Sequence, residues 1–98
     1  MSVLITGITG FVGENLNNYL KKTFNIIGVS RGGVCNNSIP YSKVSNYLDQ
    51  SKTLIHLAGK AHDLKNTSED NDYFEVNTEL TKRLFDQFLV SDCEVFIY

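Results

Sequence analysis

The chain has few of the residues on which disulfide-stabilised domains, metal sites and membrane spans depend. Its 98 residues include two cysteines, one proline and no tryptophan. Cys35 and Cys93 lie far apart, with no CxxC pair and no histidine pair nearby, so we interpret them as reduced, unrelated thiols. No apolar run is longer than a strand, and no basic segment precedes the first run. We therefore expect a cytoplasmic protein without a membrane span or a signal peptide.

No part of the sequence is strongly basic. Nine Lys and Arg residues against eleven Asp and Glu residues give a net charge of -2, and the pI is about 5.5. Basic residues are nowhere denser than in Lys21-Lys22 and Lys82-Arg83. Nucleic acids and anionic membranes are therefore not expected as partners. With 42% hydrophobic residues the composition is that of a globular protein, and residues 1–98 leave room for one domain at most.

Short apolar runs predict the strands. They cover residues 2–6, 25–30, 53–57 and 94–98, and a brief further strand is expected within 39–44. These runs lack polar alternation, which is typical of strands that are buried on both faces of a sheet. The sequence therefore predicts a sheet that is covered by helices.

Helical periodicity appears between the strands. After Gly7 the apolar positions are Val12, Leu16, Tyr19 and Leu20, which predicts a helix with this buried face and with Thr9 as its N-cap. Residues 45–51 predict one or two helical turns. A capping box at residues 67–70 opens the longest helix, which reaches about residue 91 and whose apolar face carries Asn77, Leu80 and Leu84.

The alternation of these elements predicts an α/β fold with a doubly wound parallel sheet. Right-handed crossovers then place the first strand in the middle of the sheet, with a crevice at its carboxyl end. Ligands of open parallel sheets bind in that crevice.

A glycine pattern stands at the carboxyl end of the first predicted strand. Gly7, Gly10 and Gly13 form GxxGxxG, which suits a tight turn, close approach of a pyrophosphate and close packing of a helix on the sheet. Free N–H groups at the start of the helix would cradle the anion. The pattern therefore predicts nucleotide binding, and the alternative is that the glycines serve packing alone.

Several segments in order resemble the NAD-dependent epimerase/dehydratase family of extended short-chain dehydrogenases/reductases, which acts on nucleotide sugars. They are the glycine pattern with Phe11, then Ile55-His56-Leu57-Ala58-Gly59, then Asn77 with Thr78 and the Leu80/Leu84 ridge, and finally Val95-Phe96-Ile97-Tyr98. The resemblance spans the chain and implies a partial NAD(P)-binding Rossmann domain at residues 1–98, truncated after its first half. It also implies a nicotinamide dinucleotide as ligand and, for a longer parent, a nucleotide-sugar substrate and a homodimer.

The resemblance also implies which residues meet the cofactor. The segment from Gly7 through Thr9, Gly10, Phe11 and Val12 to Gly13 matches the pyrophosphate loop. Leu57, Ala58 and Gly59 match the segment beside the adenosine, and Asn77 matches a helix asparagine near the nicotinamide. Alternatively, Asn77 bonds only the backbone of an adjacent loop.

The end of the second strand bears on the choice of cofactor. Ser30 and Arg31 stand where an NAD site would have a carboxylate for the ribose 2′-OH. Arg31 could instead pair with a 2′-phosphate, so NAD(P) is expected with NADP favoured over NAD. A solvated loop charge is the alternative for Arg31.

Further polar residues give weaker signals. Lys60 and His62 follow Gly59 at the mouth of the expected crevice and are candidates for contact with substrate, although short polar loops often carry charges that have no function. Neither His56 nor His62 has metal-ligand spacing, and no metal site is expected. We interpret His56 as a satisfied core histidine.

The chain has no Tyr-x-x-x-Lys, the pair that performs proton transfer in the resembling enzymes. We therefore name no catalytic residue and expect the chain to be the cofactor-binding part of a nucleotide-sugar epimerase, dehydratase or reductase, inactive by itself. Two alternatives remain: a non-catalytic NAD(P)-binding sensor of the same fold, and a degraded reading frame without function.

Overall fold

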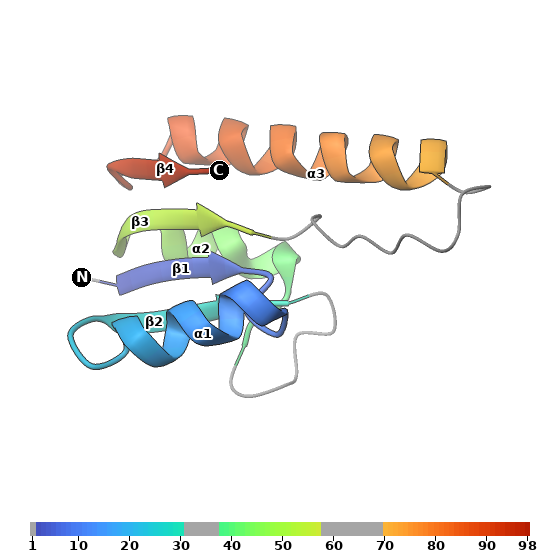
Figure 1. The fold of residues 1–98 in the computed structure, drawn as a ribbon. Helices are drawn as coiled ribbons and strands as arrows, with labels where there is room; N and C mark the ends of the chain where they lie inside the picture. The colour runs from blue at the N-terminus through green and yellow to red at the C-terminus, as the bar shows by residue number, and fades with distance from the viewer. Residues whose placement is uncertain (1, 31–37, 58–69) are drawn as a thin grey trace.

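The computed structural model describes residues 2–30, 38–57 and 70–98, and describes side chains in the last segment from Thr78 onward. A four-stranded sheet in the order β2-β1-β3-β4 forms its centre, and every pair of neighbouring strands is parallel. Figure 1 shows the strands running in one direction. The strands are β1 (Ser2–Thr6), β2 (Asn25–Val29), β3 (Ser51–His56) and β4 (Val95–Ile97). The prediction of a parallel sheet with the first strand in its interior is therefore confirmed.

Helices cover both faces of the sheet. The helix α1 lies on one face, in front of the sheet in Figure 1, and α2 and α3 pack against the other. The chain moves outward from β1 to β2 and then back past β1 to β3, so right-handed crossovers put the two sets of helices on opposite faces. The helical elements are α1 (Phe11–Leu20), the 3-10 turn η1 (Tyr41–Lys43), α2 (Val44–Leu48) and α3 (Asp70–Leu89).

Alternation along the strands builds two apolar clusters, one on each face. Val3 and Ile5 of β1 face α1, whereas Leu4 between them faces α2 and α3. The cluster on the α2/α3 face is the larger one. Its buried members are Leu4, Val29, Val44, Leu48, Leu54, Leu84 and Cys93. The α1 face has a smaller cluster of Val3, Ile5, Ile8 and Ile55.

The prediction of a strand within residues 39–44 is wrong except at Ile39. Ile39 forms an isolated parallel bridge with Val29 at the outer edge of β2. Its N–H donates to the Gly28 carbonyl, and its carbonyl accepts the N–H of Ser30, the residue after β2. Pro40 follows directly and has no N–H to continue a ladder. The chain turns there into η1 and α2 instead.

The predicted face of α1 is also partly wrong. Val12 and Tyr19 are exposed, at 58% and 72%, and the residues that turn toward the sheet are Gly13, Leu16 and Leu20. The missing side chain of Gly13 lets the helix approach the backbone of Gly7 and Ile8 in the turn after β1, and with Gly13 on the inner side Val12 faces away from the sheet. Thr9 is not the N-cap: that position belongs to Gly10, and no side chain caps the helix.

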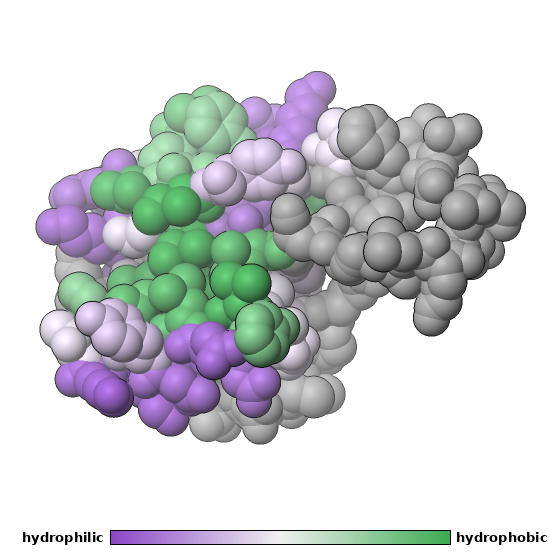
Figure 2. All heavy atoms as spheres, in the orientation of Figure 1, coloured by the Kyte–Doolittle hydropathy of each residue, from purple (hydrophilic) through white to green (hydrophobic). Residues whose placement is uncertain are grey.

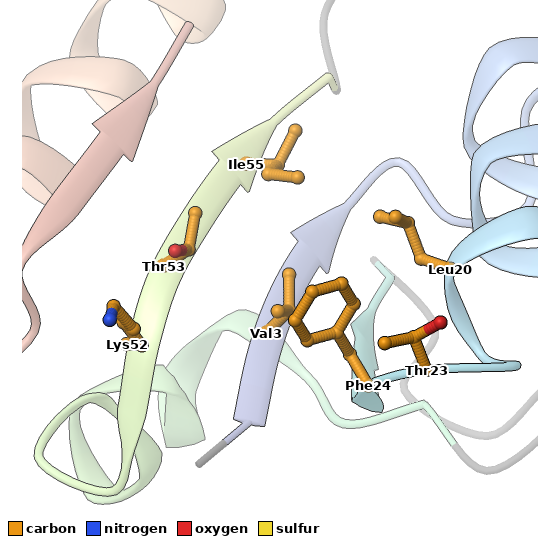
Figure 3. A pocket seen from close by; sticks show the side chains of 7 residues that line it. All are labelled: Val3, Leu20, Thr23, Phe24, Lys52, Thr53 and Ile55. Carbon is orange, nitrogen blue, oxygen red and sulfur yellow. The ribbon is translucent and has the colours of Figure 1, made fainter.

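An apolar area remains uncovered on the α1 face. Figure 2 shows hydrophobic residues gathered in the middle of this face. A cavity of about 520 Å³ lies there, lined by Val3, Leu20, Thr23, Phe24, Lys52, Thr53 and Ile55, as Figure 3 shows. Because α1 connects β1 to β2, it does not extend over β4, where Val95 and Ile97 are exposed.

Candidate functional site

The glycine pattern forms a turn between the end of β1 and the start of α1. Gly7 has φ 72, a left-handed conformation that costs other L-residues about 1–2 kcal/mol. Its N–H bonds the Val29 carbonyl of β2 at 3.2 Å, and its carbonyl accepts the Gly10 N–H at 3.0 Å. The turn is therefore held by its own backbone and by the neighbouring strand.

The start of α1 offers main-chain donors at the carboxyl edge of the sheet. Glu14 is the residue whose N–H bonds the Gly10 carbonyl, at 2.9 Å. The N–H groups of residues 11–13 precede it and have no acceptor within the helix. With the positive end of the helix dipole, such groups form an anion site.

The two other glycines differ in the space around them. A Cβ on Gly13 would lie 2.1 Å from the Gly7 carbonyl oxygen and 2.9 Å from the Ile8 Cα, so backbone atoms exclude any side chain there. A Cβ on Gly10 would meet only the Gly7 oxygen, at 3.4 Å, and Gly10 has an extended backbone with φ -79. The fold therefore demands glycine at position 13, whereas at position 10 it leaves space for a Cβ.

The end of β2 lies beside this turn and carries a pair of buried hydroxyl groups. Ser30 Oγ is 2.8 Å from Ser38 Oγ, and the Ser30 N–H donates to the Ile39 carbonyl. These bonds join Ser30 to Ser38 and Ile39. Ser30 is thus placed on the sheet edge that also carries Gly7.

The end of β3 completes the edge and contains a network that sequence reasoning did not find. His56 is 3% exposed. Its Nδ1 lies 2.6 Å from Thr6 Oγ1, and its Nε2 lies 2.9 Å from Thr81 Oγ1 of α3. The Leu57 N–H donates to Thr6 Oγ1 at 3.1 Å. The interpretation of His56 as a satisfied core histidine is confirmed.

The structure brings only some of the predicted site residues together. Those that it places at the carboxyl edge are Gly7, Thr9, Gly10, Phe11, Val12, Gly13, Ser30 and Leu57. Arg31, Ala58, Gly59, Lys60 and His62 lie outside the described residues. Asn77 belongs to α3, and its side chain also lies outside the described part. Its neighbours on the predicted face, Leu80 and Leu84, do pack into the core.

The cavity on the α1 face is distinct from this edge. None of the three glycines of the turn lines it, and its wall is mainly apolar. It therefore lacks the converging donors that an anionic ligand needs, so we place the candidate site at the glycine turn.

Other chemistry has little support in the described segments. Among the side chains of residues 2–30, 38–57 and 78–98, no three of His, Cys, Asp or Glu gather as they would around a metal ion. In the same segments, no helix is both long and apolar enough to cross a membrane. Burial raises the pKa of the Cys93 thiol above its ordinary value of 9.0, and the charge of Glu94 adds to the rise. Cys93 thus remains a neutral core residue near physiological pH.

A parallel sheet whose central strand ends in a glycine turn and a helix start belongs to the doubly wound class that binds ligands at this edge. The model of the NAD dependent epimerase/dehydratase family matches residues 3–98. The chain belongs to this family.

Solved structures share the fold. A short-chain dehydrogenase/reductase superfamily protein from Agrobacterium tumefaciens, with bound NAD, is similar with a TM-score of 0.76 and 20% identity over 98% of this chain and 31% of that one. The protein gox2253 has a TM-score of 0.74 and 22% identity, and the match covers 99% of this chain and 33% of that one. The capsular polysaccharide assembling protein CapF from Staphylococcus aureus has a TM-score of 0.53 and 22% identity, and the match covers 100% of this chain and 35% of that one.

The chain thus spans about a third of the length of these solved structures. A search of curated proteins gave no match. At these identities the structural likeness concerns the fold, which confirms the Rossmann-type α/β class expected from the sequence.

Proposed function

We propose that this chain is the nicotinamide-dinucleotide-binding part of a nucleotide-sugar epimerase, dehydratase or reductase. The observation that carries the proposal is the Gly7 turn at the carboxyl end of β1, followed by the N–H groups at the start of α1 that have no acceptor within the helix. The residues fit the group: the donors match a pyrophosphate, and the space at Gly10 admits its close approach. The family to which the chain belongs is described as NAD dependent.

Titration of the 98-residue chain with NADH and NADPH, followed by nicotinamide fluorescence and calorimetry, tests this proposal. Saturable binding is expected. Gly10→Ala should weaken it by roughly ten-fold or more, because the added Cβ meets the anion where the backbone now approaches it. The far-UV spectrum and urea midpoint of that variant should stay unchanged, since Gly10 has a backbone conformation open to alanine.

Lys52→Ala serves as the control. Lys52 lies on the cavity wall, away from the turn, and makes an exposed ion pair with Glu94 at 3.9 Å. If the dinucleotide bound in the cavity, or by unspecific attraction to positive charge, this variant would bind less well. Equal affinities of the Gly10→Ala variant and the unchanged chain would contradict the proposal, as would the absence of saturable binding.

Within this function we propose that NADP is preferred over NAD. Ser30 follows the last residue of β2 and carries no carboxylate, so no like charge opposes a 2′-phosphate there, and Arg31 comes next in the sequence. Arg31→Ala should weaken NADPH binding by roughly ten-fold, the effect of one charge-assisted hydrogen bond, and leave NADH binding unchanged. Arg83→Ala, which removes an exposed arginine from α3, is the matched control. Equal losses for both dinucleotides would refute the preference.

The remaining parts of the proposal concern the longer protein. We propose a nucleotide sugar as its substrate, Lys60 and His62 as residues that meet it, and a homodimer as its assembly. Support comes from family membership, and a capsular polysaccharide assembling protein shares the fold. The 98-residue chain by itself should bind without redox turnover because it lacks Tyr-x-x-x-Lys. An assay of nicotinamide absorbance with nucleotide sugars tests this, and turnover by the chain would contradict it.

A further inference from the structure

The two edges of the sheet differ in how they are protected. At the outer edge of β2, Ile39 forms a bridge, and Pro40 follows it without an N–H to continue the pairing. The opposite edge is β4, and in the described part of the chain no strand pairs with its outer side (Figure 1). Exposed edge strands are commonly guarded by a charge, a proline or a bulge. The residues of β4, Val95–Ile97, are apolar and pair with β3 in regular register, so they provide no such guard.

The backbone of β4 offers hydrogen bonds to a further strand at two alternate residues. The Glu94 N–H donates to the Lys52 carbonyl of β3 at 2.9 Å. Successive residues of a strand direct their N–H and C=O groups to opposite sides, so Val95 and Ile97 direct theirs away from β3. The Val95 carbonyl also accepts a long contact of 3.9 Å from the Cys93 thiol, which leaves a lone pair for another donor. Two donors and two acceptors therefore face the open side of the sheet.

Apolar side chains flank these backbone groups on both faces of the sheet. Phe96 turns toward α3, where its ring centroid lies 5.3 Å from that of Phe85. By alternation Val95 and Ile97 lie on the α1 face, and both are exposed. On the α3 face, Phe85 and Leu89 are one helical turn apart and are exposed as well. The β4 edge is thus apolar on both sides of its hydrogen-bonding groups.

The strand β4 is able to pair with a second copy of itself in the antiparallel direction. If a two-fold axis passes beside Phe96, Val95 lies opposite Ile97 of the second copy, and Ile97 lies opposite Val95 of that copy. All four residues direct backbone groups toward the other strand, so both pairs are hydrogen-bonded pairs and four N–H to C=O bonds form. A register shifted by two residues retains only one such pair within β4. Self-pairing therefore has one best register, with the two Phe96 residues opposite each other.

The same symmetry brings the two copies of α3 together. The helix is bonded to β3 through Thr81 and His56 and contacts β4 through Phe85 and Phe96, so it lies over both strands. Strands are about 4.8 Å apart in a sheet, and two such spacings separate α3 from its copy. The resulting distance of about 10 Å is one at which helices pack. The exposed flank of α3 would therefore be covered by the same flank of the second copy.

We propose that the β4 edge is the contact surface of a symmetric dimer, in which the β4 strands of two copies of this chain pair in the antiparallel direction around Phe96. The exposed side chains that this dimer covers are Phe85, Leu89, Val95, Ile97 and Tyr98. At roughly 100 Å² for each, the two copies bury about 1,000 Å² in all, which is where specific interfaces begin. The strand β3 lies between this edge and β1, which carries the glycine turn. The proposal is therefore independent of dinucleotide binding.

Disulfide cross-linking tests the register of the dimer. The proposed pairing places Glu94 opposite Tyr98 of the second copy, in a non-hydrogen-bonded pair with Cα atoms about 4.5 Å apart, which is within the range of a disulfide. Both side chains are exposed. The double variant Glu94→Cys/Tyr98→Cys, in a Cys35→Ser background, should therefore become mostly covalent dimer under mild oxidation. A mixture of the two single variants should cross-link as well.

Each single variant by itself is the matched control. Two copies of residue 94, or of residue 98, lie about 14 Å apart in the proposed register, which is too far for a disulfide. The single variants should therefore stay monomeric on denaturing gels. Cross-linking of Tyr98→Cys alone would indicate parallel pairing, and cross-linking of both single variants would indicate unordered association. Either result would overturn the proposal.

Sedimentation equilibrium measures the strength of the dimer. Val95→Lys should raise its dissociation constant by at least about ten-fold, because the dimer would bury the added charge twice. Val90→Lys makes the same change at an exposed position directly after α3 that has no place in the pairing, and it should change the constant by less than about two-fold. An unchanged chain that stays monomeric or forms only larger aggregates would refute the dimer, as would equal constants for Val95→Lys and Val90→Lys. If Val95→Lys fails to fold, the cross-linking pattern decides.

Discussion

Replacement of Gly13 by alanine tests the close approach of α1 to the strand end. The added Cβ would stand 2.1 Å from the Gly7 carbonyl oxygen, with two further backbone atoms at 2.9 Å. None of these three atoms belongs to a flexible side chain, so the helix or the turn must move by on the order of 1 Å to relieve the contact. Overpacking of this kind costs about 3 kcal/mol where backbone has to shift.

A second effect opposes this cost. Gly13 lies within α1, and alanine is favoured over glycine in a helix by about 1 kcal/mol. The net expectation is a loss of roughly 2 kcal/mol in the free energy of unfolding. In a chain of this size that loss lowers the urea midpoint by about 1 to 2 M and the melting temperature by roughly 8 to 16 °C.

Equilibrium unfolding in urea, followed by far-UV circular dichroism, measures this loss. Asn18→Ala, at an exposed position of the same helix, gives the propensity effect alone and should be neutral or slightly stabilising. Gly10→Ala should stay within about 0.5 kcal/mol of the unchanged chain. If Gly13→Ala were as stable as Asn18→Ala, the close contact between α1 and the turn would be refuted.

Three further predictions concern other parts of the molecule. Gly7→Ala should destabilise the chain by about 1–2 kcal/mol, because alanine is disfavoured at the positive φ of this position. Gly7→Asn should destabilise it less, since asparagine tolerates a positive φ better than alanine. A lower urea midpoint for Gly7→Asn than for Gly7→Ala would contradict the turn geometry. Burial raises the pKa of Cys93 above 9.0, so its contribution to stability is complete below that pH and is lost as the pH rises above it. Between pH 8 and pH 10 the urea midpoint should therefore fall less for Cys93→Ala than for the unchanged chain. An equal fall for both proteins would contradict the raised pKa of Cys93. Ile97 is 48% exposed on the edge strand β4, so the chain should self-associate through this edge. Ile97→Lys should reduce the association. If light scattering showed the unchanged chain to be a monodisperse monomer, the prediction would be wrong.

Four of the strands and the interior place of the first one could be predicted because each of these strands is a short apolar run and because crossover handedness leaves few topologies. Boundaries were less predictable. The sequence pattern predicts helix through Ser51, whereas Ser51 begins β3, where it pairs with Ser2, and its hydroxyl donates to the Tyr47 carbonyl in the preceding helix. A serine carries no strand signal of its own, so its position follows from the neighbouring strand.

The errors in α1 have a common physical cause. Periodicity counts apolar side chains, and it therefore favoured Val12 and Tyr19 for the buried face. The residue that decides the orientation of the helix is Gly13, which has no side chain to count. The close contact at Gly13 depends on the path of the turn, which a hydrophobic pattern does not contain.

The network around His56 could be suspected but not assembled from the sequence. Thr6 and His56 are both polar residues at the ends of apolar runs, which is unusual enough to suggest a shared partner. Their adjacency follows from the register, in which Thr6 pairs with His56. Thr81 joins them only through the packing of α3 on the sheet, a contact over 25 residues of sequence.

The unequal packing of the two faces separates the candidate site from the main source of stability. The larger cluster, including Leu48 and Leu84, lies between the sheet and the helices α2 and α3. The glycine turn belongs to α1 on the other face, where the cluster is smaller and part of the sheet stays exposed. A side chain added at Gly10 therefore touches little of the core, whereas one at Gly13 displaces the helix itself. Loss of binding without loss of folding is thus expected at one glycine and not at the other, although the two lie within a single turn of the chain.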